Sequence, residues 1–172
     1  MPAPEPNTDR QRGAAIETVQ RALIDVSRRV AVPQRHAQVV ERAGVEIDLV
    51  ASIVLSRLTD RGPMRLSDLA AEMLVAQSTA GRHAAQLDAA GWCARRRDPE
   101  DGRAVVVEVT EAGHAVVERL RAASRSILSD ALTTWDDDAV LALGDGLESL
   151  LRALNDHLDD ARDREAGLDG RH

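Results

Sequence analysis

The sequence predicts a mainly α-helical protein with one small β-hairpin, and three observations support this fold class. Apolar residues recur at helical spacing over much of the 172-residue chain. Two short helical segments follow each other closely between residues 67 and 90. The pattern then changes to alternation at period two, which is typical of strands. Two short helices joined by a tight turn indicate a helix-turn-helix, and a hairpin directly after it is a wing.

The N-terminal part predicts two helices after a polar start. Residues 1–13 are polar and Pro-rich, and we expect them to be disordered. From Ala14 apolar residues recur at helical spacing as far as Pro33, which should end or kink this helix. Gly44 separates it from the next predicted helix, over residues 46–60.

Residues 67–90 predict the helix-turn-helix itself. Ser67 is a suitable N-cap for the first helix. A tight turn follows near residues 74–76, and the second helix runs over residues 77–90 until Gly91 stops it.

The wing follows directly. Strands over residues 92–97 and 104–109 flank a turn that contains Pro99 and Gly102, two residues suited to tight turns. Within the second strand, alternate valines share one face, as expected for a strand that packs on a core on one side.

One face of the second helix carries side chains suited to reading base edges. At 100° per residue its polar residues occupy an arc of about 140°, and three small or apolar residues lie opposite within about 60°. Arginine can donate two hydrogen bonds to guanine, and glutamine can pair with adenine. We therefore expect these residues in the major groove: Gln77, Ser78, Thr79, Arg82, His83 and Gln86. The alternative is an ordinary amphipathic helix with a solvated polar face.

The wing tip predicts a contact in the minor groove. Arg103 lies there, and narrow A/T tracts concentrate the negative potential that attracts arginine. Asp101 is placed to hold the Arg103 guanidinium by a charge-assisted hydrogen bond. We assign phosphate contacts, which add affinity without sequence information, to Ser67, Arg95, Arg96 and Arg97.

The remaining residues predict two long helices, one from Thr110 and one after Asp138, with leucines recurring up to Leu158. These terminal helices are too apolar to stand alone, which predicts a homodimer. The expected organisation is a disordered N-terminus (1–13), an N-terminal dimerisation helix (14–45), a winged helix-turn-helix DNA-binding domain (46–112), C-terminal dimerisation helices (113–160) and a polar tail (161–172).

Composition excludes several classes of protein. Trp92 and Trp135 are the only aromatic residues, which argues against readers of single-stranded nucleic acid that stack bases on aromatic rings. A single cysteine excludes an internal disulfide. No apolar run is long enough for a membrane span, and the polar N-terminus does not resemble a signal peptide. We therefore expect a cytoplasmic protein with no membrane partner.

The formal net charge of −7 does not exclude a DNA-binding protein, because the charge is unevenly distributed. Residues 130–172 hold 12 acidic residues and 4 Arg. Residues 78–129 hold 7 acidic residues and 8 Arg. The acidic excess is therefore concentrated at the C-terminal end.

No pattern predicts catalysis, a cofactor or a metal. The chain lacks a glycine-rich phosphate loop, a nucleophile elbow and an H-E-x-x-H motif. The run Asp136–Asp138 suits a helix start, where acids complement the helix dipole. Four histidines lack close metal-ligand spacing: His36, His83, His114 and His157.

The segment LSDLAAEMLVAQSTAGRHAAQLDAAGWCARRRDPEDGRAVVVEVTEAGHAVV resembles the multiple-antibiotic-resistance regulator (MarR) family. The resemblance covers about Arg65 to Val117, and its most specific part is the wing RRRDPEDGRA followed by VTEAG. Three positions depart from the family pattern. Leu74 stands where a turn glycine is frequent, Ala76 stands where an acidic cap is frequent, and Gly81 lies inside the recognition helix, which predicts a softer helix.

The resemblance implies a homodimer built from the terminal helices, a palindromic double-stranded DNA operator, and a repressor that a small aromatic or phenolic effector releases. By position it implies the same groove-reading and wing-orienting roles for Ser78, Thr79, Arg82, His83, Arg103 and Asp101. We take His36, Ser56 and Arg57 as candidate residues of the ligand pocket.

Two alternatives remain open. The acidic tail and the lack of Lys leave room for a winged-helix module that binds proteins rather than DNA. The other alternative is a redox-sensing repressor that uses Cys93. In the first wing strand, however, a cysteine is expected to act as a small buried hydrophobe.

Overall fold

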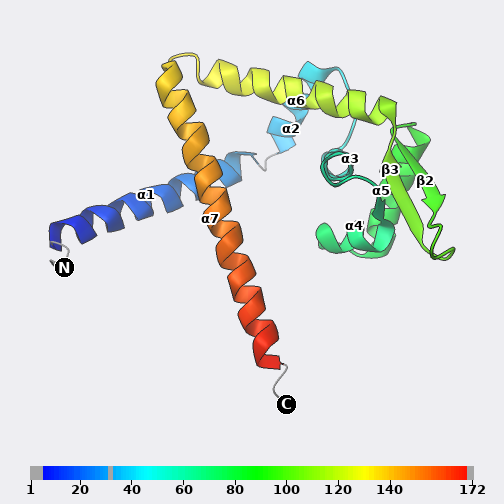
Figure 1. The fold of residues 1–172 in the computed structure, drawn as a ribbon. Coiled ribbons are helices and arrows are strands. Elements are labelled where there is room, and N and C mark those ends of the chain that lie inside the picture. Colours follow the sequence, from blue (N-terminus) through cyan, green and yellow to red (C-terminus); the bar gives the residue numbers. More distant parts are fainter. Residues whose placement is uncertain (1–5, 31–32, 170–172) are drawn as a thin grey trace. The chain divides into compact units, whose positions relative to one another are not determined.

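The computed structural model describes the backbone of residues 6–30 and 33–169 and the side chains of residues 10–29 and 34–157. These residues form helices and one small antiparallel sheet, which confirms the predicted fold class (Figure 1). The chain divides into two compact units, residues 1–126 and 127–172. No helix in this described part combines the length and the apolar character that a membrane span requires.

The predicted helix-turn-helix and wing are present in the order expected. The helices are α1 (Pro6–Val30), α2 (Pro33–Ala43), α3 (Leu49–Arg61), α4 (Leu66–Glu72), α5 (Gln77–Ala89), α6 (Glu111–Ala131) and α7 (Asp137–Asp169). The strands are β1 (Met64–Arg65), β2 (Cys93–Arg97) and β3 (Val105–Val109). Helices α4 and α5 are the helix-turn-helix, and β2 and β3 are the wing.

The terminal helices extend further than the apolar pattern indicated. Helix α1 begins at Pro6, so the part of the expected disordered N-terminus from residue 6 onward is helical, and residues 1–5 lie outside the described residues. Helix α7 continues to Asp169, into the expected polar tail. Ala, Arg and Glu are good helix formers, so a polar segment can continue a helix without an apolar stripe.

Pro33 begins a separate helix. As the first residue of α2 it needs no backbone N–H, and its fixed φ suits the first turn. Helix α3 begins at Leu49, after Asp48, whose side chain accepts a hydrogen bond from the Ala51 amide at 2.8 Å. This N-cap explains why the helix starts later than residue 46.

The sheet has three strands rather than the predicted two. Strand β3 lies in the centre, antiparallel to both β1 and β2. Arg65 of β1 pairs with Val106, and Cys93 of β2 pairs with Val109. A strand of two residues has no periodicity to detect, so β1 was not predicted.

One core joins the helix-turn-helix, the wing and the start of α6. Its fully buried large side chains come from α3, α4, α5, β3 and α6: Val54, Leu55, Leu58, Leu69, Leu87, Val107 and Val117. Strand β3 and helix α5 are thus anchored in the same packed interior.

The VTEAG segment forms the junction between the wing and α6. The Thr110 hydroxyl accepts a hydrogen bond from the Gly113 amide at 3.1 Å, so Thr110 caps the helix. The same hydroxyl donates to the Gly91 carbonyl at 2.7 Å. A Cβ at Gly113 would overlap the Trp92 carbonyl oxygen, so only glycine allows this close approach.

Gly113→Ala should destabilise the protein by about 1–3 kcal/mol, because the added methyl group forces helix and strand apart. Urea unfolding at a fixed protein concentration measures the change. Gly81→Ala is the matched control. Its Cβ would lie 3.5 Å from Leu66 Cδ2, an ordinary contact, and Ala favours the helix by about 1 kcal/mol. A Gly113→Ala variant as stable as wild type would contradict this account of the junction.

Cys93 is part of the core, with 2% of its surface exposed. Burial foremost, together with the negative charge of Asp88, raises the pKa of its thiol to about 12. The thiolate is the reactive form of cysteine, so this environment argues against a redox sensor.

The Cys93 thiol should therefore react slowly with a disulfide reagent such as DTNB. With a pKa of about 12, only about one thiol in 10⁴ is ionised at pH 8. The expected result is a rate far below that of the same protein unfolded in guanidinium, where the pKa returns to about 8.5. Equal rates in the two states would revive the redox alternative.

Candidate nucleic-acid interface

Helix α5 separates a buried face from a polar face. Ala80, Ala84 and Leu87 are buried, as expected. On the opposite side Gln77, Ser78, Arg82 and Gln86 are exposed, whereas Thr79 and His83 are half-buried.

The start of α5 shows the departures noted in the sequence. Ala76 is the N-cap and makes no side-chain hydrogen bond to the helix. Leu74, in the preceding turn, has φ of 54° and is 93% exposed. A left-handed backbone is unfavourable for a residue with a Cβ, so this turn stores strain that a glycine would relieve.

Two of the proposed reading residues face Asp48 at the N-terminus of α3. Gln86 Nε2 donates to Asp48 Oδ2 at 2.9 Å. Burial opposes ionisation of Asp48, but hydrogen bonds from Ala51 and Gln86 and the nearby His83 together lower its pKa. His83 Nδ1 is buried without a hydrogen-bond partner in the described structure. The proposed reading residues that are exposed and do not contact Asp48 are therefore Gln77, Ser78 and Arg82, in the first half of the helix.

The wing turn is organised by Asp98, which sequence reasoning did not single out. Its Oδ1 accepts hydrogen bonds from the backbone amides of Glu100 at 2.8 Å and Asp101 at 3.4 Å. Its Oδ2 accepts from Arg65 Nε at 2.5 Å. The Glu100 hydrogen bond foremost, with Arg65, holds the pKa of Asp98 below its usual range. The Asp-Pro start of the turn was the available signal, because Asp favours turns of this kind.

Asp101 contacts the backbone of Arg103 rather than its guanidinium. Its Oδ1 accepts a hydrogen bond from the Arg103 amide at 3.0 Å. The Arg103 side chain is exposed at the tip of the hairpin. Asp101 therefore shapes the turn that carries Arg103, and the expected carboxylate–guanidinium bond does not form in the structure.

The residues assigned to phosphates differ in their surroundings. Arg95, Arg96 and Arg97 are exposed along β2, and Arg96 Nε donates to Glu108 at 3.1 Å. Ser67 is not the N-cap of α4, because Arg65 occupies that position and Ser67 lies within the first turn. The exposed Ser67 hydroxyl donates to Asp68 Oδ1 at 3.1 Å.

Two of the three candidate ligand residues line one pocket between α2, α3 and α6. The pocket has a volume of about 200 Å³, and Arg57 does not line it. His36 Nε2 contacts the Ile47 carbonyl oxygen at 2.9 Å. The lining residues are His36, Val39, Ser52, Ser56, Leu120, Arg121 and Ser124.

Comparison with known proteins finds the same fold in solved structures. A MarR family protein from Bacillus stearothermophilus matches with a TM-score of 0.71 and 18% identity, over 83% of this chain and 97% of that one. The transcriptional regulator Tm0710 from Thermotoga maritima matches with a TM-score of 0.65 and 23% identity, over 83% and 98%. FabT from Streptococcus pneumoniae, solved in complex with DNA, matches with a TM-score of 0.56 and 16% identity, over 82% and 98%.

No curated protein matches the chain. The model of the MarR family matches residues 52–105, the segment that runs from α3 through α4 and α5 to the start of β3. This segment contains both the polar face of α5 and the wing tip. This segment is therefore similar to the MarR family, within a chain whose fold matches the solved structures above.

Proposed function

We propose that this protein is a sequence-specific, double-stranded DNA-binding transcriptional regulator that acts as a homodimer on a palindromic operator. The observation that carries the proposal is that the MarR-like segment contains two exposed arginines, Arg82 on α5 and Arg103 on the wing. Such proteins read the major groove with a helix and the minor groove with the wing. The DNA-bound structure of FabT, which shares the fold, supports this reading.

In this proposal the first half of α5 provides base readout. Arg82 donates two hydrogen bonds to a guanine, and Gln77, Ser78 and Thr79 contact neighbouring bases or phosphates. Gln86 must release Asp48 before it can reach a base. His83 is half-buried, so at most one edge of its ring can contact a base. Readout should therefore depend more on Arg82 than on Gln86.

The wing and β2 provide the second part of the interface. Arg103 enters the minor groove, where it recognises groove width rather than individual bases. Arg95, Arg97 and Ser67 bind phosphates, and Arg96 does so by exchanging Glu108 for a phosphate. Because phosphate contacts release counterions, binding should weaken steeply as salt rises.

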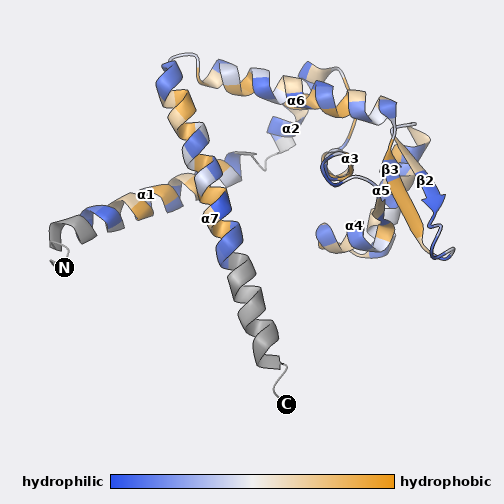
Figure 2. Ribbon diagram, viewed as in Figure 1, coloured by the Kyte–Doolittle hydropathy of each residue, from blue (hydrophilic) through white to orange (hydrophobic). Residues whose placement is uncertain are grey.

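The terminal helices supply the dimer. Figure 2 shows hydrophobic positions recurring along α1 and the described part of α7. Several of these side chains are well exposed in the single chain, including Ile16 (57%), Leu141 (64%) and Leu151 (60%). Apolar stripes of this kind are buried in a stable protein, and a second copy of the chain is the proposed partner.

The pocket lined by His36 and Ser56 is the proposed effector site. Its volume of about 200 Å³ suits a single-ring aromatic or phenolic molecule, and its histidine and serines offer hydrogen bonds to a hydroxyl group. Its walls belong to α2, α3 and α6. A ligand that favours a dimer with misplaced recognition helices would release DNA, which makes the protein a repressor.

Arg103→Ala and Arg82→Ala should each weaken binding to a duplex selected from a random library by about 1–3 kcal/mol, which is about fivefold to 150-fold. Arg82→Ala should also relax the base preference at one position in each half-site, whereas Arg103→Ala should not. Fluorescence anisotropy at two salt concentrations measures both effects.

The control for these variants is Arg152→Ala. Arg152 is exposed on α7, where it contacts Ser149, and removing it deletes one positive charge that does not belong to the proposed set of DNA contacts. Its affinity should equal that of wild type. A folded wild-type dimer that binds no duplex at low salt would instead favour the protein-interaction module.

Leu147→Arg should convert the dimer into a monomer, because it places a charge on the apolar stripe of α7. Sedimentation at micromolar concentration measures the state, and circular dichroism checks that the variant is folded. Glu148→Arg, one residue further along the same helix, changes more charge but leaves the stripe intact and should remain dimeric. A wild-type protein that sediments as a monomer would contradict the dimer.

A further inference from the structure

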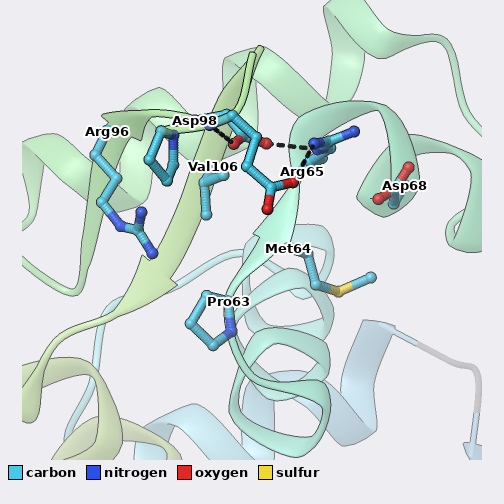
Figure 3. Close-up of a pocket in the computed structure, with 9 residues that line it drawn as sticks. Pro63, Met64, Arg65, Asp68, Arg96, Asp98 and Val106 are labelled. Carbon is cyan, nitrogen blue, oxygen red and sulfur yellow. Dashed lines mark hydrogen bonds and ion pairs between the residues drawn. The ribbon is translucent and has the colours of Figure 1, made fainter. Parts of the chain in front are cut away.

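One carboxylate links the tip of the wing to the beginning of the helix-turn-helix. Asp98 is 7% exposed and is the one buried charged residue among those the structure describes. Figure 3 shows its carboxylate turned toward the Arg65 guanidinium. A buried carboxylate is stable only when it is paired and hydrogen-bonded, so this contact is required by the burial.

The two oxygens of Asp98 have different partners. Oδ1 accepts the amides of Glu100 and Asp101 and so holds the wing turn from within. Oδ2 is bound by Arg65, whose Nη2 also lies 3.8 Å from Glu100 Oε2. The Asp98 amide donates to the Ala104 carbonyl at 3.0 Å and closes the base of the turn. Arg65 is therefore the one side chain from outside the hairpin that bonds to this carboxylate.

Arg65 is itself fixed by the backbone. It pairs with Val106 in the sheet and is also the N-cap residue of α4. A displacement of the wing tip must therefore stretch the Arg65–Asp98 ion pair or move the start of the helix-turn-helix. Hinge motion of a hairpin about its base is otherwise inexpensive, because few contacts hold a loop tip.

We propose that Arg65 is a positioning residue that fixes the wing tip, and with it Arg103, relative to α5. This inference rests on the proposed function, because its effect is on how the wing meets DNA. In the free protein the ion pair holds the wing in the orientation needed for the minor groove. Without it, binding must first order the wing, and affinity falls by the cost of that ordering.

A direct contact between Arg65 and a phosphate is the competing role, because 42% of the Arg65 side chain is exposed. The two roles predict different couplings. A positioning residue acts through Arg103, so its loss has little further effect once Arg103 is absent. A residue that binds a phosphate acts independently of Arg103. Its removal therefore weakens binding equally in both backgrounds and lowers the slope of log K against log salt by about 0.9.

The experiment is a double-mutant cycle on the selected duplex, with Arg65→Met, Arg103→Ala and the double variant. In the wild-type background Arg65→Met should weaken binding about threefold to tenfold. In the Arg103→Ala background the same substitution should change affinity less than about twofold, with an unchanged salt slope. An equal loss in both backgrounds would overturn the positioning role.

Asp98→Asn is the second variant and guards against misfolding of the first. It keeps an oxygen for the Glu100 amide, removes the charge that binds Arg65, and adds no positive charge of its own. It should reproduce the Arg65→Met loss and its dependence on Arg103. Arg61→Met is the matched control, because Arg61 forms a comparable ion pair with Glu72 at 3.0 Å outside the wing. It should bind DNA like wild type.

The outcomes separate the two proposals. Wild-type protein that binds no duplex refutes the proposed function. If wild type binds and Arg103→Ala weakens binding, while Arg65→Met and Asp98→Asn both bind like wild type, then DNA binding stands and the role of Arg65 is refuted.

Discussion

The packing of strand β3 is the constraint on which the rest of the interface depends. Val107, at its centre, is fully buried in the same core as Leu55 of α3 and Leu87 of α5. Each side chain of this size stabilises the fold by about 1.5–3 kcal/mol when buried. Strand β3, which carries the wing, and helix α5, which carries the polar face, share one interior, so neither element can shift without opening a cavity next to the other. The core therefore fixes the buried parts of both elements, and polar contacts fix the positions of their exposed ends.

Those polar contacts distribute charge in a way that the net value of −7 conceals. Acidic side chains contact two arginines in or next to the wing, with Asp98 at Arg65 and Glu108 at Arg96. Such pairs keep guanidinium groups oriented, and they also oppose non-specific attraction to phosphates. In the proposed function, specific binding to DNA therefore depends on a few correctly placed arginines rather than on a broad basic surface. We expect this arrangement to favour discrimination between sequences over affinity for DNA in general.

The sequence was informative wherever a residue pattern has a period or a required geometry. Helix α5 and the second wing strand were predicted because their apolar residues recur at 3.6 and 2.0 residues. Strand β1 has only two residues and therefore no period that a sequence pattern could show. Residue type alone does not distinguish an N-cap, the role predicted for Ser67, from a position in the following turn. The Arg65–Asp98 pair joins residues 33 positions apart in the chain, a relation that only the folded sheet reveals. Similarly, no pattern in α5 could indicate that Gln86 is held by Asp48.

In the proposed complex, α5 and the wing of each subunit engage one duplex in its two grooves at once. Dimethyl sulfate interference on the selected site distinguishes the two grooves, because this reagent methylates guanine N7 in the major groove and adenine N3 in the minor groove. We expect two symmetric clusters of interfering guanines about one helical turn apart, each flanked by interfering adenines. Interference confined to one groove, or a single cluster without symmetry, would contradict it.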